Sequence, residues 1–290
     1  MEIQLLHTTS TYWILVRKRI IRRTTRKRSR ARSQTYVSSR TLLIQTNNIQ
    51  FIPYTHVQAS ASNGGVVFAP PGLYVFDGHL EIPSGVTLKG SYHSVPSHDL
   101  RAGPLQTDGT ILIPREGRGD ATKDPFLHVR ANAAVAGLVI YYDQQETVQI
   151  PVPYPWTILM EGNNAAVTDC ELLGSWRGIN ATAAHRHYIA RIQGQPIDLG
   201  VYIDQTYDIG RMENVHFNPW FSSSQPFITY QLTYGRAFVL GRSDWEYVFN
   251  TFAFGYAIGY HFIETSTGSM NGNFLGLGAD LAINASVRSR

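Results

Sequence analysis

Apolar residues occur along most of this chain in short runs, and most of these runs are closed by Gly, Asn, Asp or Pro. The stretch 64–90, GGVVFAPPGLYVFDGHLEIPSGVTLKG, contains four of them. A helix is not expected to pass through such punctuation, because Pro lacks an amide donor and Gly weakens helices. No long segment from residue 41 onward shows the 3.6-residue period of an amphipathic helix. The pattern predicts an all-β chain of brief strands joined by tight turns.

The expected strands are rich in Val, Ile, Leu and aromatic residues, as half-buried strands usually are. They are Val66–Phe68, Leu73–Phe76, Val86–Leu88, Thr110–Ile113, Val135–Ile140, Thr157–Met160, Val167–Leu172, His187–Ile192, Gly200–Ile203, Met212–Phe217, Ala237–Leu240 and Val248–Phe252.

A weak internal repeat, apolar-x-[Gly/Asp/Asn]-x, begins at Val135, Val167, Met212 and Val248. Its intervals are 32, 45 and 36 residues, and His187-Tyr-Ile-Ala is a possible further unit within the longest interval. Units with variable insertions are typical of a solenoid, in which each coil buries its inward side chains against its neighbours. Gly and Asn adopt the left-handed backbone that sharp corners require. The alternative is a β-sandwich, but longer strands and more hairpin signals would then be expected.

Residues 63–90 and the strand Gly109–Ile113 resemble the first coils of the pectate-lyase-like superfamily. The shared pattern is Gly-Gly, an apolar triplet, Pro-Pro-Gly, an aromatic strand and Ile-Pro-x-Gly-Val-x-Leu-x-Gly. The resemblance implies a single-stranded right-handed parallel β-helix, an extracellular location and a polysaccharide as ligand. It specifies the fold better than the activity, because the superfamily includes lyases, hydrolases, epimerases and non-catalytic fibres. Ten residues follow Asp280, so a truncated member with missing C-terminal coils is expected.

The charge of the chain is distributed unevenly. Residues 1–40 hold 11 of the 25 Lys and Arg residues and a single acid, and ten of these bases fall within 17–32. We therefore expect a disordered basic tail at 1–40 and one β-helix domain at 41–290, which carries 14 basic and 20 acidic residues. The tail could be a nuclear-localisation or phosphate-binding patch, a mitochondrial-type presequence, or a segment with no function. The rest gives no reason to expect nucleic-acid binding, and no apolar run is long enough to span a membrane.

Cys170 is the single cysteine, so no intrachain disulfide is possible, and its apolar context predicts a core position. No spacing of Cys, His or acidic residues matches a metal site, and no cofactor motif is present. The sequons at Asn180 and Asn284 are compatible with secretion. The oligomeric state and the polysaccharide itself are left open by these features.

Cleavage of a glycosidic bond generally needs two carboxyl groups facing one groove. Asp204 and Asp208 would share a face if VYIDQTYDIG were extended, although both could instead be turn residues. Asp169 aligns with the Asn positions of the repeat, which favours a turn role and leaves Glu171 as the better candidate on that strand. His187 could shuttle a proton or contact a sugar hydroxyl. The predicted catalytic residues are therefore Asp204, Asp208, Glu171 and His187.

Sugar rings stack on flat aromatic faces, and arginine can hold a carboxylate in a bidentate fork. Arg186 and Arg211 are candidates for the second role, with surface ion pairing as the alternative. Trp220, Trp245 and Tyr207 are candidates for the first, with core packing as the alternative. Trp220 follows a proline in FNPWF, so we expect it to be exposed in a loop.

The catalytic motifs of the polygalacturonases and of the calcium-dependent pectate lyases do not occur in this sequence, so no known active site can be transferred to it. The sequence predicts a carbohydrate-active β-helix protein without a cofactor. Cleavage of glycosidic bonds by hydrolysis is favoured over lyase chemistry, because carboxylates outnumber suitable cations around the candidate residues. The alternative is a non-catalytic β-helix that binds glycans or serves as a structural module.

Overall fold

The computed structural model describes residues 64–94, 103–104 and 108–289, together with the backbone of four strands nearer the N-terminus. These are β1 (Ile3–Thr8), β2 (Thr11–Val16), β3 (Leu43–Ile44) and β4 (Ile49–Phe51), each paired antiparallel with the next. Strands β1 and β2 fall within the segment predicted as a tail. The basic run 17–32 lies outside the described residues.

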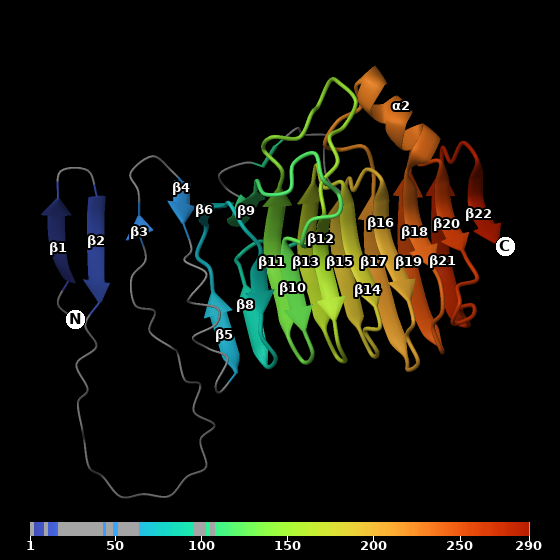
Figure 1. The fold of residues 1–290 in the computed structure, drawn as a ribbon, viewed down its shortest axis with the longest axis horizontal. Coiled ribbons are helices and arrows are strands. Elements are labelled where there is room, and N and C mark those ends of the chain that lie inside the picture. The colour runs from blue at the N-terminus through green and yellow to red at the C-terminus, as the bar shows by residue number, and fades with distance from the viewer. Residues whose placement is uncertain are drawn as a thin grey trace, which may run out of the picture.

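From residue 64 onward the chain winds through two parallel sheets, and the strands of each follow one another along the long axis of the molecule (Figure 1). Sheet A contains β5 (Gly65–Phe68), β6 (Gly72–Phe76), β8 (Val86–Lys89), β9 (Thr110–Pro114), β11 (Ala134–Tyr141), β13 (Ala166–Leu173), β15 (Tyr188–Gly194), β17 (Gly210–Phe217), β19 (Glu246–Phe254) and β21 (Gly272–Asp280), joined by the four N-terminal strands. Sheet B contains β7 (Leu80–Ile82), β10 (Leu127–Arg130), β12 (Trp156–Glu161), β14 (Arg177–Thr182), β16 (Leu199–Asp204), β18 (Arg236–Leu240), β20 (Ile258–Phe262) and β22 (Ala285–Ser289).

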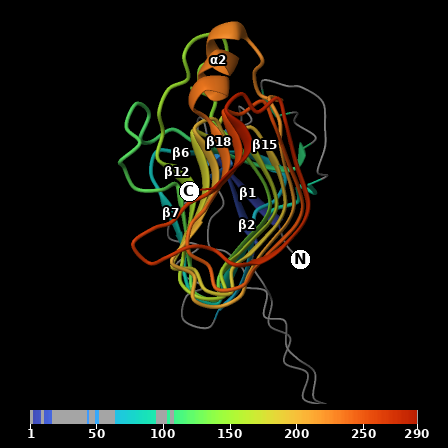
Figure 2. The same ribbon diagram turned by 90° about the vertical axis from the view of Figure 1, so that its right-hand side faces the viewer.

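The strands of each sheet pair in parallel from β4 onward within the described part of the chain. From β9 onward, strands from the two sheets alternate in sequence, and the view along the axis in Figure 2 shows successive coils superimposed around one interior. The structure therefore confirms the prediction of an all-β, parallel-strand solenoid. A sandwich of hairpin-linked antiparallel strands is excluded for this region.

The repeat marks a column of left-handed residues within sheet A. Gly137, Asp169, Arg191, Asn214, Asn250 and Gly276 all have positive φ, and the strand registers place them next to one another on successive coils. Each interrupts the extended backbone within its strand at the same level, which bends the strand there. The missing unit of the repeat begins at Ile189 rather than at His187, so Arg191 follows Asp169 after 22 residues. The repeat pattern did not detect this coil, because its corner position, which favours Gly or Asn, is occupied by an arginine.

Side chains one residue after this column and two residues before it point inward and form the core. The inward residues of one level are Leu138, Cys170, Ile192, Val215, Thr251 and Leu277. Cys170 is fully buried, which confirms its predicted core position, and burial raises the pKa of its thiol to about 12. The stacked aliphatic side chains bury apolar surface between coils, and this burial stabilises the solenoid.

One α-helix, α2 (Gln225–Tyr234), interrupts the strands between β17 and β18 and rises above one end of both sheets (Figures 1 and 2). The sequence pattern did not predict it, because its apolar residues are not gathered on one face. Its boundaries were readable in part, since Pro226 begins it and Gly235 follows it. Gln231 anchors the helix by accepting a hydrogen bond from Gln195 and donating one to the carbonyl of Gly255.

Candidate functional site

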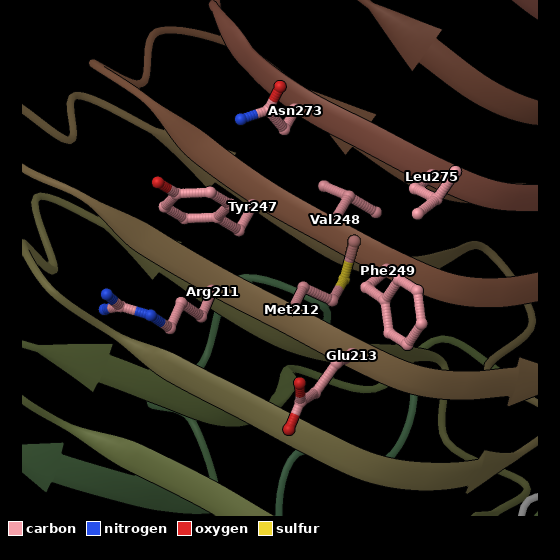
Figure 3. Close-up of a pocket in the computed structure, with 8 residues that line it drawn as sticks. All are labelled: Arg211, Met212, Glu213, Tyr247, Val248, Phe249, Asn273 and Leu275. Atoms are coloured by element: carbon pink, nitrogen blue, oxygen red, sulfur yellow. The ribbon is translucent and has the colours of Figure 1, made fainter.

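A shallow groove lies on the outer face of sheet A, across β17, β19 and β21 (Figure 3). Its volume is about 330 Å³. The lining residues are Arg211, Met212, Glu213, Tyr247, Val248, Phe249, Asn273 and Leu275. Met212 and Val248 are buried, whereas the side chains that alternate with them reach the surface. The groove is therefore built from the outward residues of three neighbouring coils.

The outward residues change character along the solenoid. One column reads Ala134, Ala166, Tyr188, Arg211, Tyr247 and Asn273 from coil to coil. The next column reads Ala136, Thr168, Ala190, Glu213, Phe249 and Leu275. The early coils thus carry small side chains, and the later coils carry aromatic, charged and amide groups at the same positions. Since β17 and β19 bury their inward residues as the earlier coils do, the solenoid itself does not require the larger outward groups on these strands.

Arg211 and Tyr247 form one end of the groove. The guanidinium carbon of Arg211 lies 5.5 Å from the ring centroid of Tyr247 on the adjacent strand, within the range of a cation–π contact. Arg211 is exposed, and 38% of the surface of Tyr247 is accessible to solvent. This pair offers a flat ring beside a fork of hydrogen-bond donors.

Glu213 is held at the side of the groove by its neighbours. The hydroxyl of Tyr188 donates a hydrogen bond to Glu213 Oε1, and this bond raises the pKa of the tyrosine. Next to it, Arg191 donates two hydrogen bonds of 2.7 Å to Asp169, and these bonds hold the pKa of Asp169 below its usual range. This local network orients Glu213 and gives Asp169 the corner role that the sequence predicts.

Asp204 lies at the end of β16 with only 3% of its surface exposed. Its Oδ1 accepts hydrogen bonds from the backbone amide of Arg242 at 2.8 Å and from the Thr265 hydroxyl at 3.0 Å. Its Oδ2 accepts one from Tyr202 at 3.2 Å. The carboxylate thus binds the turns of the following coils through Arg242 and Thr265. This is the turn role that was the alternative to catalysis in the sequence-based prediction.

Asp208 does not share a strand face with Asp204, because β16 ends at Asp204 and Gln205 has a left-handed φ of 56°. Its Oδ1 accepts the amide of Ile209 at 3.0 Å, and its Oδ2 pairs with Arg186. The hydrogen bond from Arg186 lowers the pKa of Asp208. Arg186 also donates to Asn164 at 2.8 Å, so it joins a surface row of corner residues. Both side chains are therefore engaged at the corner.

Glu171 and His187, the other two candidates for catalysis, are fully buried. Glu171 lies on β13, in register with Gln193 of β15. His187 directs Nε2 toward Glu246 Oε1 at 3.0 Å and Nδ1 toward the carbonyl of Ala184 at 2.8 Å. Neither side chain is open to a polymer in this structure. The four candidates for catalysis are thus not gathered in one open groove.

The predicted binding residues are distributed in three ways. Arg211 lines the groove, whereas Trp220 is 7% exposed, with its ring 4.7 Å from His216, so the expectation of an exposed Trp220 is wrong. A proline before a residue does not decide exposure when the loop folds back on the sheet. Tyr207 and Trp245 are exposed at 51% and 47% at the corner that precedes the groove strands. The ring centroid of Tyr207 lies 5.5 Å from the ring centroid of His185 and 6.0 Å from the guanidinium carbon of Arg242.

Four residues that line the groove were not predicted from the sequence: Glu213, Phe249, Asn273 and Leu275. One available signal was the alternation in Trp245-Glu-Tyr-Val-Phe249, which places three aromatic residues at every second position. The other signal was the change from small to large outward residues along the coils. Reading it requires the correct alignment of β15, which the sequence repeat did not give.

No protein-family model matches this chain, and no match is found among curated proteins. Among the described residues, no group of three or more His, Cys, Asp or Glu side chains could hold a metal ion. In the same part of the chain, no helix has the length and apolar character needed to cross a bilayer.

Proposed function

We propose that this protein is a right-handed parallel β-helix of the pectate-lyase-like type that binds a polysaccharide without cleaving it. The supporting observation is the groove on sheet A, where Tyr247 and Phe249 are exposed beside Arg211, Glu213 and Asn273. Aromatic faces stack on the apolar faces of sugar rings, and the polar neighbours can bond sugar hydroxyl groups. The coiled parallel strands and the residues 64–90 support the assignment to this superfamily.

Binding is favoured over hydrolysis because of how the carboxylates are held. A glycosidase needs two carboxyl groups at a separation of roughly 5–10 Å across an open groove. Asp204 and Glu171 are buried, and Asp208 is bound to Arg186 and its own corner. Glu213 is the carboxylate that lines the groove, and its described partner is a tyrosine.

The test is affinity electrophoresis of the full chain in gels that contain pectin, galactan, rhamnogalacturonan or a neutral glucan. Tyr247→Ala is expected to lose most of the retardation that the wild type shows. Tyr234→Ala is the matched control, since Tyr234 is 60% exposed on α2, away from the groove. Equal retardation of both variants would contradict the assignment of the groove. Measurement at low and high salt separates this binding from attraction to the basic run 17–32, which salt screens.

A reducing-end assay on the same polysaccharides tests the absence of cleavage. We expect no release by the wild type, Asp204→Asn or Asp208→Asn. Release by the wild type that either substitution abolishes would replace this proposal with a glycosidase.

A further inference from the structure

The exposed aromatic residues near the groove follow one strand rather than the solenoid axis. Tyr247 and Phe249 alternate on β19, and Trp245 is the corner residue directly before this strand. Trp245, Tyr247 and Phe249 have 47%, 38% and 47% of their surfaces exposed. Glu246 and Val248 between them are buried. Outward residues of a strand are about 7 Å apart. We call Trp245, Tyr247 and Phe249 the β19 row.

Trp245 has a strained, left-handed backbone conformation. The fold does not require a tryptophan at this position. Trp245 lies two residues before Tyr247, and the residues at the equivalent position of earlier coils are Asn132, Asn164, Arg186 and Ile209. Asn132, Asn164 and Arg186 have positive φ and Ile209 does not, whereas Trp245 has a φ of 69°. Asn enters this region at little cost, whereas a bulky aromatic residue rarely does. A strained, exposed tryptophan beside a groove is the kind of feature that function retains at the expense of stability.

The charges around the β19 row favour a neutral ligand. Arg211 and Glu213 of β17 flank it with opposite charges, and Asn273 of β21 flanks it with an uncharged amide. A polymer with a carboxylate on every ring would place like charges close to Glu213. Sugar hydroxyl groups can instead accept from Arg211 and Asn273 and donate to Glu213.

From these observations we propose that the β19 row binds a neutral polysaccharide whose chain runs along β19, across the solenoid axis, with successive rings stacked on Phe249, Tyr247 and Trp245. This inference rests on the proposed function and adds the orientation and the class of the ligand. The groove extends over three coils, so a chain along the axis is the alternative. It would contact Leu275 of β21, which lines the groove, instead of Trp245, which does not.

The experiment compares Trp245→Asn with Leu275→Ala in binding to a soluble neutral glucan and to polygalacturonate. Asn is chosen because it suits the left-handed backbone, so the corner is expected to stay folded, as thermal unfolding will show. Leu275→Ala distinguishes the two orientations, because Leu275 is 66% exposed and lines the groove on β21, where only a chain along the axis would contact it. Tyr234→Ala, outside the groove, is the control. Trp245→Asn and Phe249→Ala are each expected to weaken glucan binding about three- to tenfold, the range of one aromatic stacking contact. Leu275→Ala should change it less than twofold.

Loss of glucan binding in Leu275→Ala with none in Trp245→Asn would overturn the orientation while leaving the proposed function in place. Polygalacturonate binding that persists at 0.3 M salt, at about a 6 Å screening length, and disappears in Arg211→Ala would overturn the neutral class. A wild type that binds no polysaccharide in any gel would overturn the proposed function, and this inference with it.

Discussion

His187 Nε2 lies 3.0 Å from Glu246 Oε1, and neither side chain is exposed to solvent. The two residues are 59 positions apart in the chain, and they meet beside Gly210, where an added Cβ would come within 2.3 Å of both side chains. His187 Nδ1 must donate its proton to the carbonyl of Ala184, while Glu246 Oε2 accepts from the Ser243 hydroxyl at 2.7 Å. The net pKa of His187 is raised in spite of its burial, which favours a second proton on Nε2 that is donated to Glu246 Oε1.

Glu246→Gln is expected to destabilise the fold by about 3 kcal/mol, because breaking a buried ion pair leaves a polar group without its charged partner. Urea unfolding followed by circular dichroism measures the change. Glu264→Gln is the control, since Glu264 is exposed and no ion pair of it is described. If the two variants were equally stable, the pair would not contribute to the stability of the solenoid.

The pH dependence of stability has a definite sign. Burial alone lowers the pKa of His187, but the charge and hydrogen bond of Glu246 outweigh it, and the net pKa is raised. The His187–Glu246 pair therefore stabilises the fold fully below about pH 6.5, the usual pKa of a histidine in an unfolded chain. This contribution is lost as the pH rises through the pKa of His187 in the folded protein. We expect the Tm to fall from pH 6 upward in the wild type. Glu246→Gln should show a flatter profile, and a rise of the Tm over this range would contradict the assignment.

The left-handed column predicts unequal effects of two substitutions at Asn214. Asn214 has a φ of 52° and accepts a hydrogen bond of 2.7 Å from Asn250. Asn214→Ala should cost about 1–2 kcal/mol, because alanine is strained in this conformation. Asn214→Gly should cost less, since glycine enters it freely. Chemical denaturation of the two variants tests this order, and an equal loss would mean that the corner conformation does not set the cost.

Trp245→Asn should raise the free energy of unfolding by about 1 kcal/mol, although it is expected to weaken glycan binding. The gain comes from relief of the left-handed backbone of a bulky residue, and the bond from its amide to Asn271 Oδ1, 2.9 Å long, is retained. Thermal unfolding measures the change. A lower Tm would show that the indole packs against the protein and is not held free for a ligand.

Cys170 should react with iodoacetamide only when the chain unfolds. It is fully buried, and its thiol has a pKa raised to about 12, so little thiolate is present at neutral pH. Mass spectrometry after timed labelling is expected to show no modification of the folded protein and complete modification in denaturant. Rapid labelling under native conditions would show that the core opens at β13.

The candidate site was only partly readable from the sequence. Arg211, Trp245 and Tyr207 could be selected by residue type, and the structure places all three at the surface. Asp204, His187 and Trp220 were chosen by the same reasoning and are buried. Residue type gives the chemistry that a side chain can perform, but its exposure depends on which coil lies beside it.

The sequence by itself determined the short strands, the left-handed corners and the core position of Cys170, because these follow from local backbone preferences and the alternation of apolar residues. Only the tertiary structure decided which side chains meet across coils. Within the left-handed column, the spacing between equivalent residues varies from 22 positions for Asp169 and Arg191 to 36 for Asn214 and Asn250. Insertions between strands set this spacing. The pairing of His187 with Glu246 and the groove beside Tyr247 could therefore not be predicted from sequence spacing.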